Sequence, residues 1–264
     1  MTFGQDVAEV PYFIGHEAAK SIAAASPILL ATEQVDLDAA YGRVLSQDLA
    51  SKVDDPPFDN SAMDGFAFIH SDSLETPATL TIIQTIQAGD ANATQDLLSG
   101  QATRIMTGAP MPQGATSILP IECCEVNEGG TEVTLLEQGR PHFIRKRGEN
   151  LREGETNLTK GTTLTPAKVG LCATMGWPTV PVYKKARIGI ISTGDELKFP
   201  GEPLEPHQIY ESNSFGLGSL VQWMGHEAVR YQAVADSIDS LRRALNTATE
   251  ECDLVLTSGG VSMG

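Results

Sequence analysis

Short apolar segments alternate with amphipathic ones in the last part of the chain, and this alternation constrains the fold more than any other feature. The expected order is strand, helix, strand, helix and strand, at 187–191, 212–224, 227–235, 241–250 and 253–257. Strands that are joined through helices make right-handed crossovers and lie parallel in one sheet. The sequence therefore predicts an incomplete Rossmann-like parallel α/β domain at 184–264, with a ligand crevice at the carboxyl ends of its strands.

Polar residues follow each of the three expected strands. Asp195 and Glu196 follow the first, Asp236 and Ser237 follow the second, and a Ser-Gly-Gly-Val-Ser loop that starts at Ser258 follows the third. Converging carboxylates can hold Mg²⁺, which bridges phosphate oxygens, and a glycine loop lets backbone amides approach a phosphate. A plain turn, and capping of the next helix by Asp236 or Ser237, would explain the same residues. The predicted ligand is a metal together with a phosphorylated compound.

The chain before this region is predicted to form a scaffold with a β-rich insertion. Helices are expected in the alanine-rich run 16–26 and from Thr165-Pro166 to Gly176, where proline opens the helix and glycine closes it. Strands are expected at 78–86, 131–136 and 179–183. The chain is therefore predicted to be a multi-domain α/β protein. Its parts are a discontinuous scaffold domain at 1–50 and 147–183, an inserted β-rich domain at 51–146, and the α/β domain at 184–264.

Composition narrows the classes of partner. The 264 residues include 18 basic and 34 acidic ones, a net charge of −16, which disfavours binding to nucleic acid or an anionic membrane. The apolar stretches are much shorter than the roughly 20 residues of a membrane-spanning helix, and no charged-then-apolar leader opens the chain. Four cysteines without a Cys-x-x-Cys spacing argue against a zinc site and fit a reducing cytoplasm. We expect a soluble, cytoplasmic protein.

Three segments of the predicted scaffold and insertion carry further candidate functional residues. The motif FDNSAMDGFA at 58–67 crowds two carboxylates, an amide and a hydroxyl behind a Pro-Pro pair, although a capped turn would use the same side chains. The densest basic stretch is 145–147, which is either an anion site or a solvated turn. Thr107 ends a predicted strand, where its hydroxyl could donate to an oxyanion or to a local turn.

Six motifs together resemble those of the molybdopterin molybdotransferases, the MoeA and gephyrin E-domain family. They occur in the family's order: FDNSAMDGFA (58–67), RIMTGAPMP (104–112), IRKRGEN (144–150), STGDEL (192–197), IYESN (209–213) and TSGGVS (257–262). The resemblance covers essentially the whole chain and implies a molybdopterin-binding type for the α/β domain. It implies a transferase of molybdenum cofactor biosynthesis that inserts molybdate into adenylylated molybdopterin and releases AMP, aided by Mg²⁺. A homodimer and a molybdopterin adenylyltransferase partner are implied by resemblance as well.

The resemblance also assigns roles to individual residues. It implies catalytic roles for Asp64, Thr107, Glu196 and Asp236, of which Glu196 and Asp236 would bind the metal. The residues implied to bind the pterin and phosphate groups are Asn60, Ser61, Arg145, Arg147, Ser258, Gly259, Gly260 and Ser262. Because carboxylates repel molybdate and phosphate, Asp64 would act through a metal, a protonated oxygen or a water.

The sequence departs from the family pattern at two positions and at its end. Asn150 stands where the family usually has an aspartate, and Glu211 stands where it commonly has an aspartate. The chain stops at Gly264, after the third predicted strand, whereas family chains continue with further motifs. We therefore expect a C-terminally truncated chain. The alternative function is a non-catalytic pterin-binding or scaffold protein of the same family. An adenylylating pterin-binding enzyme is disfavoured because it would not need the motifs at 58–67 and 104–112.

Overall fold

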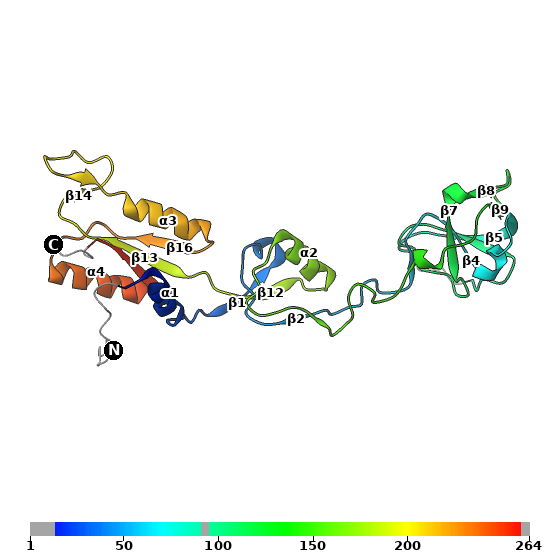
Figure 1. The fold of residues 1–264 in the computed structure, drawn as a ribbon, viewed down its shortest axis with the longest axis horizontal. Helices are drawn as coiled ribbons and strands as arrows, with labels where there is room; N and C mark the ends of the chain where they lie inside the picture. The colour runs from blue at the N-terminus through cyan, green and yellow to red at the C-terminus, as the bar shows by residue number, and fades with distance from the viewer. Residues whose placement is uncertain (1–13, 91–94, 260–264) are drawn as a thin grey trace. The chain divides into compact units, whose positions relative to one another are not determined.

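The fold is described from a computed structural model at residues 14–90 and 95–259 (Figure 1). The chain divides into two compact units. Unit one contains Met1–Gln34 and Pro181–Gly264, and unit two contains Val35–Val180. The three-part division expected from the sequence stays a prediction. Along the described chain no helix is long and apolar enough to cross a membrane.

A parallel three-stranded sheet forms the centre of unit one, as the strand and helix alternation predicts. The strands are β13 (Arg187–Ser192), β16 (Glu227–Arg230) and β17 (Leu254–Ser258), in the order β16-β13-β17. Both pairings are parallel, with Ile188 opposite Ala228 on one side and opposite Leu254 on the other. The predicted Rossmann-like α/β class of this region is therefore confirmed.

Helices cover both faces of this sheet (Figure 1). Helix α3 (Asn213–Trp223) packs on β13 and β16, and α4 (Ile238–Glu251) packs on β13 and β17. Ile188 and Ile190 contribute to the core with Val221 of α3, while Gly189 lies under Ala248 of α4. This alternation follows the two-residue period of a strand. The remaining elements of unit one are α1 (His16–Ala24), β14 (Leu197–Lys198) and β15 (Ile209–Tyr210).

The second strand of this sheet is shorter than predicted. The apolar pattern predicts a strand over 227–235, but β16 ends at Arg230. Val234 rejoins the sheet through a single parallel bridge to Thr193. The predicted segment therefore consists of a short strand, a gap in the strand pairing and an isolated β-bridge. An apolar sequence pattern alone does not distinguish such a segment from one continuous strand.

Unit two is dominated by a six-stranded sheet with the order β7-β4-β6-β5-β9-β8. Its strands are β4 (Gly65–Phe68), β5 (Ala78–Ile86), β6 (Gln101–Ile105), β7 (Ser117–Pro120), β8 (Cys124–Val126) and β9 (Glu132–Leu135). Strands β5 and β6 are parallel, and the other pairs are antiparallel. Phe66 and Phe68 of β4 are fully buried in one core cluster, while Ala67 faces a second cluster around Ile86 and Ile105.

The rest of the chain between these regions consists of short elements. Helix α2 (Pro166–Thr174) begins where Thr165 Oγ1 accepts a hydrogen bond from Lys168 N at 3.4 Å, and Gly176 follows it with a φ of +82°. The predicted start and stop signals are therefore confirmed. The strands of this part are β1 (Thr32–Asp36), β2 (Leu49–Ala50), β3 (Asn60–Ser61), β10 (Ile144–Arg145), β11 (Thr156–Leu158) and β12 (Thr179–Tyr183). They form the pairs β1-β12, β3-β10 and β2-β11.

Candidate functional site

Three motifs that are far apart in the sequence form one hydrogen-bonded block in unit two. Ser61, in the first motif, donates its backbone N–H to Ala109 O at 3.0 Å and accepts from Gly108 N at 2.8 Å. On its other side Ser61 lies opposite Ile144 in the β3-β10 pair, and Ala62 N donates to Phe143 O at 2.8 Å. The segments 58–67, 104–112 and 143–150 are therefore joined through their backbones, which the sequence did not indicate for any of them singly.

Asp64 and Thr107 meet within this block. The Asp64 carboxylate accepts two hydrogen bonds at its Oδ1, from Thr107 N at 2.7 Å and from Thr107 Oγ1 at 2.7 Å. These bonds, first that of the backbone N–H and then that of the hydroxyl, hold the pKa of the Asp64 carboxyl below its ordinary value. Both residues are exposed. The block thus presents an ionised carboxylate and a hydroxyl side by side at exposed positions.

The basic stretch beside this pair is held by carboxylates. Lys146 Nζ lies 2.7 Å from Asp59 Oδ2, and Arg147 donates its backbone N–H to Asp59 Oδ1 at 2.9 Å. The Arg147 Nε lies 2.5 Å from Asp54 Oδ2. The hydrogen bond from Lys146 lowers the pKa of Asp59. Arg145 is exposed and makes no ion pair with any described residue, so of the two predicted anion-binding arginines it is the one with an uncommitted charge.

The side chains of Ser61 and Asn60, both in the first motif, differ in whether their polar atoms are hydrogen-bonded. The Ser61 hydroxyl donates to Met63 O at 2.6 Å and accepts from Met63 N at 3.2 Å, which is the local turn considered above. Asn60 is 9% exposed, and its Oδ1 is buried without a hydrogen-bond partner in the described chain. A buried acceptor without a partner is uncommon, so Asn60 is the residue of this motif with unused hydrogen-bonding capacity.

Asn150, the first departure from the family pattern, has a partner of its own. Its Nδ2 donates to Asp55 Oδ2 at 3.0 Å, and its backbone N–H donates to Asp55 O at 2.9 Å. An aspartate at this position would bring two carboxylates together, whereas the amide donates to one. The amide of Asn150 is therefore compatible with the neighbouring carboxylate of Asp55.

In unit one, the polar clusters that follow the three strands come together, as the parallel order predicts. Thr193 N donates to Ser258 O at 2.9 Å, which joins the ends of β13 and β17. Asp236 N donates to Asp195 Oδ1 at 3.1 Å, which joins the end of β13 to the segment after β16. Asn213 Nδ2 donates to Ser258 Oγ at 2.7 Å, so the start of α3 reaches the same place. Asn213 was not singled out from the sequence, although it belongs to the IYESN motif.

The alternative explanation of Ser237 as a helix cap is confirmed. Its Oγ accepts from Ser240 N at 3.2 Å at the start of α4. Asp236 does not cap this helix; its backbone instead contacts Asp195. The capping explanation therefore leaves the Asp236 carboxylate free for another role.

Glu211, the second departure, is a buried carboxylate that fixes the strand end. It is 4% exposed and accepts hydrogen bonds from Ser192 Oγ at 2.8 Å, Ser214 N at 2.6 Å and Ser214 Oγ at 2.6 Å. Burial alone would raise the pKa of Glu211, but the bonds from Ser214 and Ser192 and the charge of Arg230 outweigh it and lower that pKa. Glu211 therefore links the end of β13 to the first turn of α3, where a negative charge is favourable.

Gly259 follows β17 with a φ of +102°, and its loop has a steric reason for a glycine. A Cβ there would lie 2.5 Å from Thr193 O and 2.6 Å from Thr193 Oγ1. The close approach to Thr193 thus explains Gly259 without a phosphate, as the plain-turn alternative allows. The predicted ligands Gly260 and Ser262 lie outside the described residues.

Gly259→Ala is expected to destabilise unit one by about 2 kcal/mol, because the added methyl group cannot be placed without moving the backbone of Thr193. Urea denaturation followed by far-UV circular dichroism measures this. Gly216→Ala is the control, because Gly216 lies in α3 and no atom comes within 4 Å of the place that its methyl group would take. This second change should leave stability equal or slightly higher. Equal stability of the Gly259 variant and the wild type would contradict the close approach.

The carboxylates of this strand-end cluster are compatible with Mg²⁺ in one binding mode. Across the described ranges, no group of three or more His, Cys, Asp or Glu side chains is placed to hold a metal ion. Mg²⁺ commonly uses only one or two protein carboxylates and completes its shell with waters and substrate phosphates. Glu196 and Asp236 offer oxygen donors of that kind. Asp195, which the sequence placed beside them, is the carboxylate that contacts the Asp236 backbone.

Comparison with known protein families finds matches to two regions of the chain. A family model described as the MoeA N-terminal region (domain I and II) matches residues 15–176, and one described as a probable molybdopterin binding domain matches 189–264. The chain combines an α/β unit that has polar strand ends with a β-rich unit, and it is therefore a multi-domain α/β protein. The chain belongs to the MoeA family, whose N-terminal model covers more than half of it.

Individual relatives agree with this assignment. The chain is 41% identical to molybdopterin molybdenumtransferase 2 of Mycobacterium tuberculosis over 87% of its own length and 57% of the relative. It is 37% identical to the molybdopterin molybdenumtransferase of Haemophilus influenzae over 90% of its length and 58% of that protein. A crystal structure of the molybdopterin biosynthesis moeA protein of Pyrococcus horikoshii OT3 matches with a TM-score of 0.83 and 34% identity, over 95% of this chain and 66% of that one. The chain thus spans somewhat more than half the length of these curated relatives.

Proposed function

We propose that the chain acts in molybdenum cofactor biosynthesis as a molybdopterin molybdotransferase, which inserts molybdate into adenylylated molybdopterin and releases AMP. The observation that carries this proposal is the pair of Asp64 and Thr107, which two short hydrogen bonds bring together from motifs 43 residues apart. Membership in the MoeA family and relatives named molybdopterin molybdenumtransferases support it.

The ionised state of Asp64 limits what it can do. A carboxylate whose pKa is lowered by two hydrogen bonds stays charged near neutral pH and repels molybdate and phosphate oxygens. Asp64 would therefore accept a proton from a water or from a protonated oxygen of the substrate, with Thr107 fixing the orientation of the carboxylate. The Thr107 hydroxyl donates its hydrogen bond to Asp64, so it can act only as an acceptor toward a ligand.

The strand ends of unit one would hold the phosphate side of the substrate. Glu196 and Asp236 would bind Mg²⁺, which supplies positive charge to the phosphate oxygens when it is present. Ser258 and Gly259, with Gly260 and Ser262 beyond the described residues, would line the pterin-phosphate side. In unit two, Arg145 has a charge available for an anion, Arg147 would have to share its charge with Asp54, and Asn60 and Ser61 would offer polar atoms. A homodimer, an adenylyltransferase partner and a cytoplasmic location belong to the same proposal.

The test is molybdate-dependent release of AMP from adenylylated molybdopterin. Asp64→Asn is expected to lower turnover about a hundredfold with little change in substrate binding, because the amide keeps the size of the group but cannot take up a proton. Thr107→Val should lower turnover and Thr107→Ser should restore it, since serine keeps the hydroxyl. Asp38→Asn, an exposed change in the same unit, is the control and should leave turnover unchanged.

Two outcomes would count against the enzymatic function. Unchanged AMP release in Asp64→Asn would remove this residue from the mechanism. Binding of adenylylated molybdopterin without any molybdate-dependent AMP release would favour the alternative, a non-catalytic pterin-binding or scaffold protein.

A further inference from the structure

The two carboxylates proposed to bind Mg²⁺ lie on different segments of unit one. Glu196 belongs to the segment 193–210, which follows β13, and Asp236 ends the segment 227–236, which begins with β16. In the part of the chain that the structure describes, no hydrogen bond or ion pair holds either carboxylate. The Glu196 carboxylate folds back over Gly194, since a Cβ on Gly194 would lie 2.6 Å from its Oε2. The separation of the two carboxylates therefore depends on how their segments are held.

One aromatic ring, that of Phe215 in the first turn of α3, contacts both segments. It is tilted at 55° to the ring of Phe199, with the centroids 5.3 Å apart, and Phe199 lies three residues after Glu196. The guanidinium carbon of Arg230 lies 3.8 Å from the centroid of the Phe215 ring, and Arg230 lies six residues before Asp236. Both distances are typical of favourable aromatic and cation–π contacts. Phe215 therefore joins the two segments.

Backbone hydrogen bonds hold the chain on the other side of Glu196. Gly194 N donates to Val234 O at 3.2 Å, which attaches the chain just before Glu196 to the second segment. Ile209 N donates to Glu196 O at 2.9 Å, which ties Glu196 to the β14-β15 pair. Glu196 therefore lies between two attachment points, the backbone bond before it and the aromatic contact after it.

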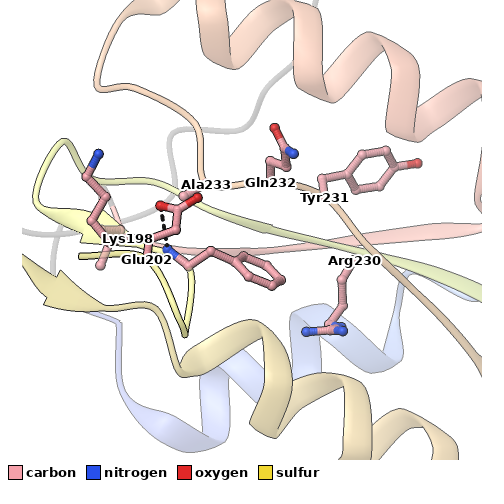
Figure 2. Close-up of a pocket in the computed structure, with 8 residues that line it drawn as sticks. Lys198, Glu202, Arg230, Tyr231, Gln232 and Ala233 are labelled. Atoms are coloured by element: carbon pink, nitrogen blue, oxygen red, sulfur yellow. Dashed lines mark hydrogen bonds between the residues drawn. The ribbon is translucent and has the colours of Figure 1, made fainter. Parts of the chain in front are cut away.

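Beyond these attachment points a pocket separates the two segments. Lys198 and Glu202 line it from the first segment, and Arg230 lines it from the second (Figure 2). Gly218 of α3 leaves room for the arginine side chain, because a Cβ there would lie 3.3 Å from Arg230 Cδ. Arg230 makes no ion pair with any described residue, so its guanidinium is oriented by the ring of Phe215. The contact with this ring thus fixes the second segment beside the pocket.

We propose that Phe215 is a positioning residue, whose ring sets the separation of the Glu196 and Asp236 carboxylates by holding the two segments that carry them. Residues that orient metal ligands without touching the metal typically change metal affinity by about 10- to 100-fold. Leucine at position 215 would keep most of the apolar volume but would lack the ring face that attracts Arg230. The inference rests on the proposed metal site, and it assigns Phe215 no contact with metal or substrate.

The first experiment measures Mn²⁺ binding to the full chain from the electron paramagnetic resonance signal of the free ion, with Mn²⁺ as the probe for a divalent metal. Phe215→Leu is expected to weaken Mn²⁺ binding about tenfold. Phe199→Leu, at a residue that is 45% exposed, should also weaken it, and Phe215→Tyr should keep the wild-type affinity because it keeps the ring. Leu220→Ala, at an exposed position of the same helix away from the pocket, is the control and should leave the affinity unchanged. Far-UV circular dichroism verifies the fold of each variant.

A double-mutant cycle separates positioning from a general structural effect. Glu196→Gln removes one of the two ligands, after which the separation of the pair no longer affects Mn²⁺ binding. Phe215→Leu should therefore weaken Mn²⁺ binding in the wild-type background and have no further effect in the Glu196→Gln background. A loss of the same size in both backgrounds would contradict the positioning role.

A second measurement follows the attachment of the segment without any metal. Hydrogen exchange with mass spectrometry reports on the peptide that contains Ile209, whose N–H is bonded to Glu196 O. Phe215→Leu is expected to speed exchange of this peptide about tenfold, because the segment loses one of its attachment points. The control Leu220→Ala should leave the exchange rate unchanged.

Two further results would overturn the inference. One is unchanged Mn²⁺ affinity in Phe215→Leu when Glu196→Gln weakens it, which would leave the proposed metal site in place. The other is an unchanged exchange rate at Ile209 in Phe215→Leu. Unchanged Mn²⁺ affinity in Glu196→Gln would instead refute the proposed metal site and this inference with it. The two failures can therefore be distinguished.

Discussion

Gly65→Ala is expected to destabilise unit two by more than about 3 kcal/mol. A Cβ at this position would overlap Leu119 O and lie 3.0 Å from Pro120 Cα, so the added atom collides with the backbone of the neighbouring strand. Strand β4 lies between β6 and β7, and all four of its residues are buried. It cannot move away from β7 without disturbing its pairing with β6. The motif glycine is therefore required by strand packing, independently of any ligand.

The measurement is urea denaturation followed by tryptophan fluorescence in a Trp223→Phe background. Trp223 is 84% exposed and belongs to unit one, whereas Trp177 is in unit two and donates its ring N–H to Ala50 O at 2.9 Å. Gly170→Ala is the control, because Gly170 lies inside α2 with no atom within 4 Å, and alanine there should stabilise by about 0.5–1 kcal/mol. If Gly65→Ala and Gly170→Ala changed the free energy of unfolding equally, the close packing of β4 against β7 would be contradicted.

Glu211→Ala is expected to destabilise unit one by about 3 kcal/mol, because it leaves the buried hydroxyls of Ser192 and Ser214 and the N–H of Ser214 without their acceptor. Glu205→Ala is the control, since Glu205 is exposed in the nearby connection between β14 and β15, and it should change stability by less than about 0.5 kcal/mol. Far-UV circular dichroism during urea denaturation measures both. Equal stability of the two variants would show that Glu211 does not bind the strand end.

The same carboxylate predicts a pH dependence. The pKa of Glu211 is lower in the folded chain than its ordinary value of 4.5, so the folded state binds this proton more weakly than the unfolded state does. The stabilisation is fully present above pH 4.5 and is lost as the pH falls toward the folded pKa. The difference in unfolding free energy between the wild type and Glu211→Gln should therefore be largest at pH 7 and smaller below pH 4.5. A difference that grows on acidification would reverse the assigned direction.

Much of the fold could be predicted because its signals are local. Thr165-Pro166 and Gly176 mark both ends of α2 through their own backbone preferences, and the strands at 78–86 and 179–183 have the predicted bounds. The parallel order of the α/β sheet follows from the handedness of its crossovers, and with it the meeting of the polar strand ends. These features do not depend on which distant residue is the partner.

What the sequence did not indicate depends on distant partners. Asp54 and Asp59 bind Arg147 and Lys146 at sequence separations of 93 and 87 positions, and a basic stretch alone does not show its acidic partners. Glu211 lies in a polar segment that is typical of the surface, and its burial results from the serines around it. The geometry between Asp64 and Thr107 likewise required the pairing of β4 with β6, which brings Gly65 opposite Ile105.

The backbone bonds that join the three motif segments of unit two have a genetic consequence. Substitutions at Ala62, Gly108 and Phe143 act on one shared ladder, so their effects should be epistatic, with coupling energies of about 0.5–3 kcal/mol in double-mutant cycles. A change tolerated in one segment would then become harmful, or be rescued, according to the residue carried by another.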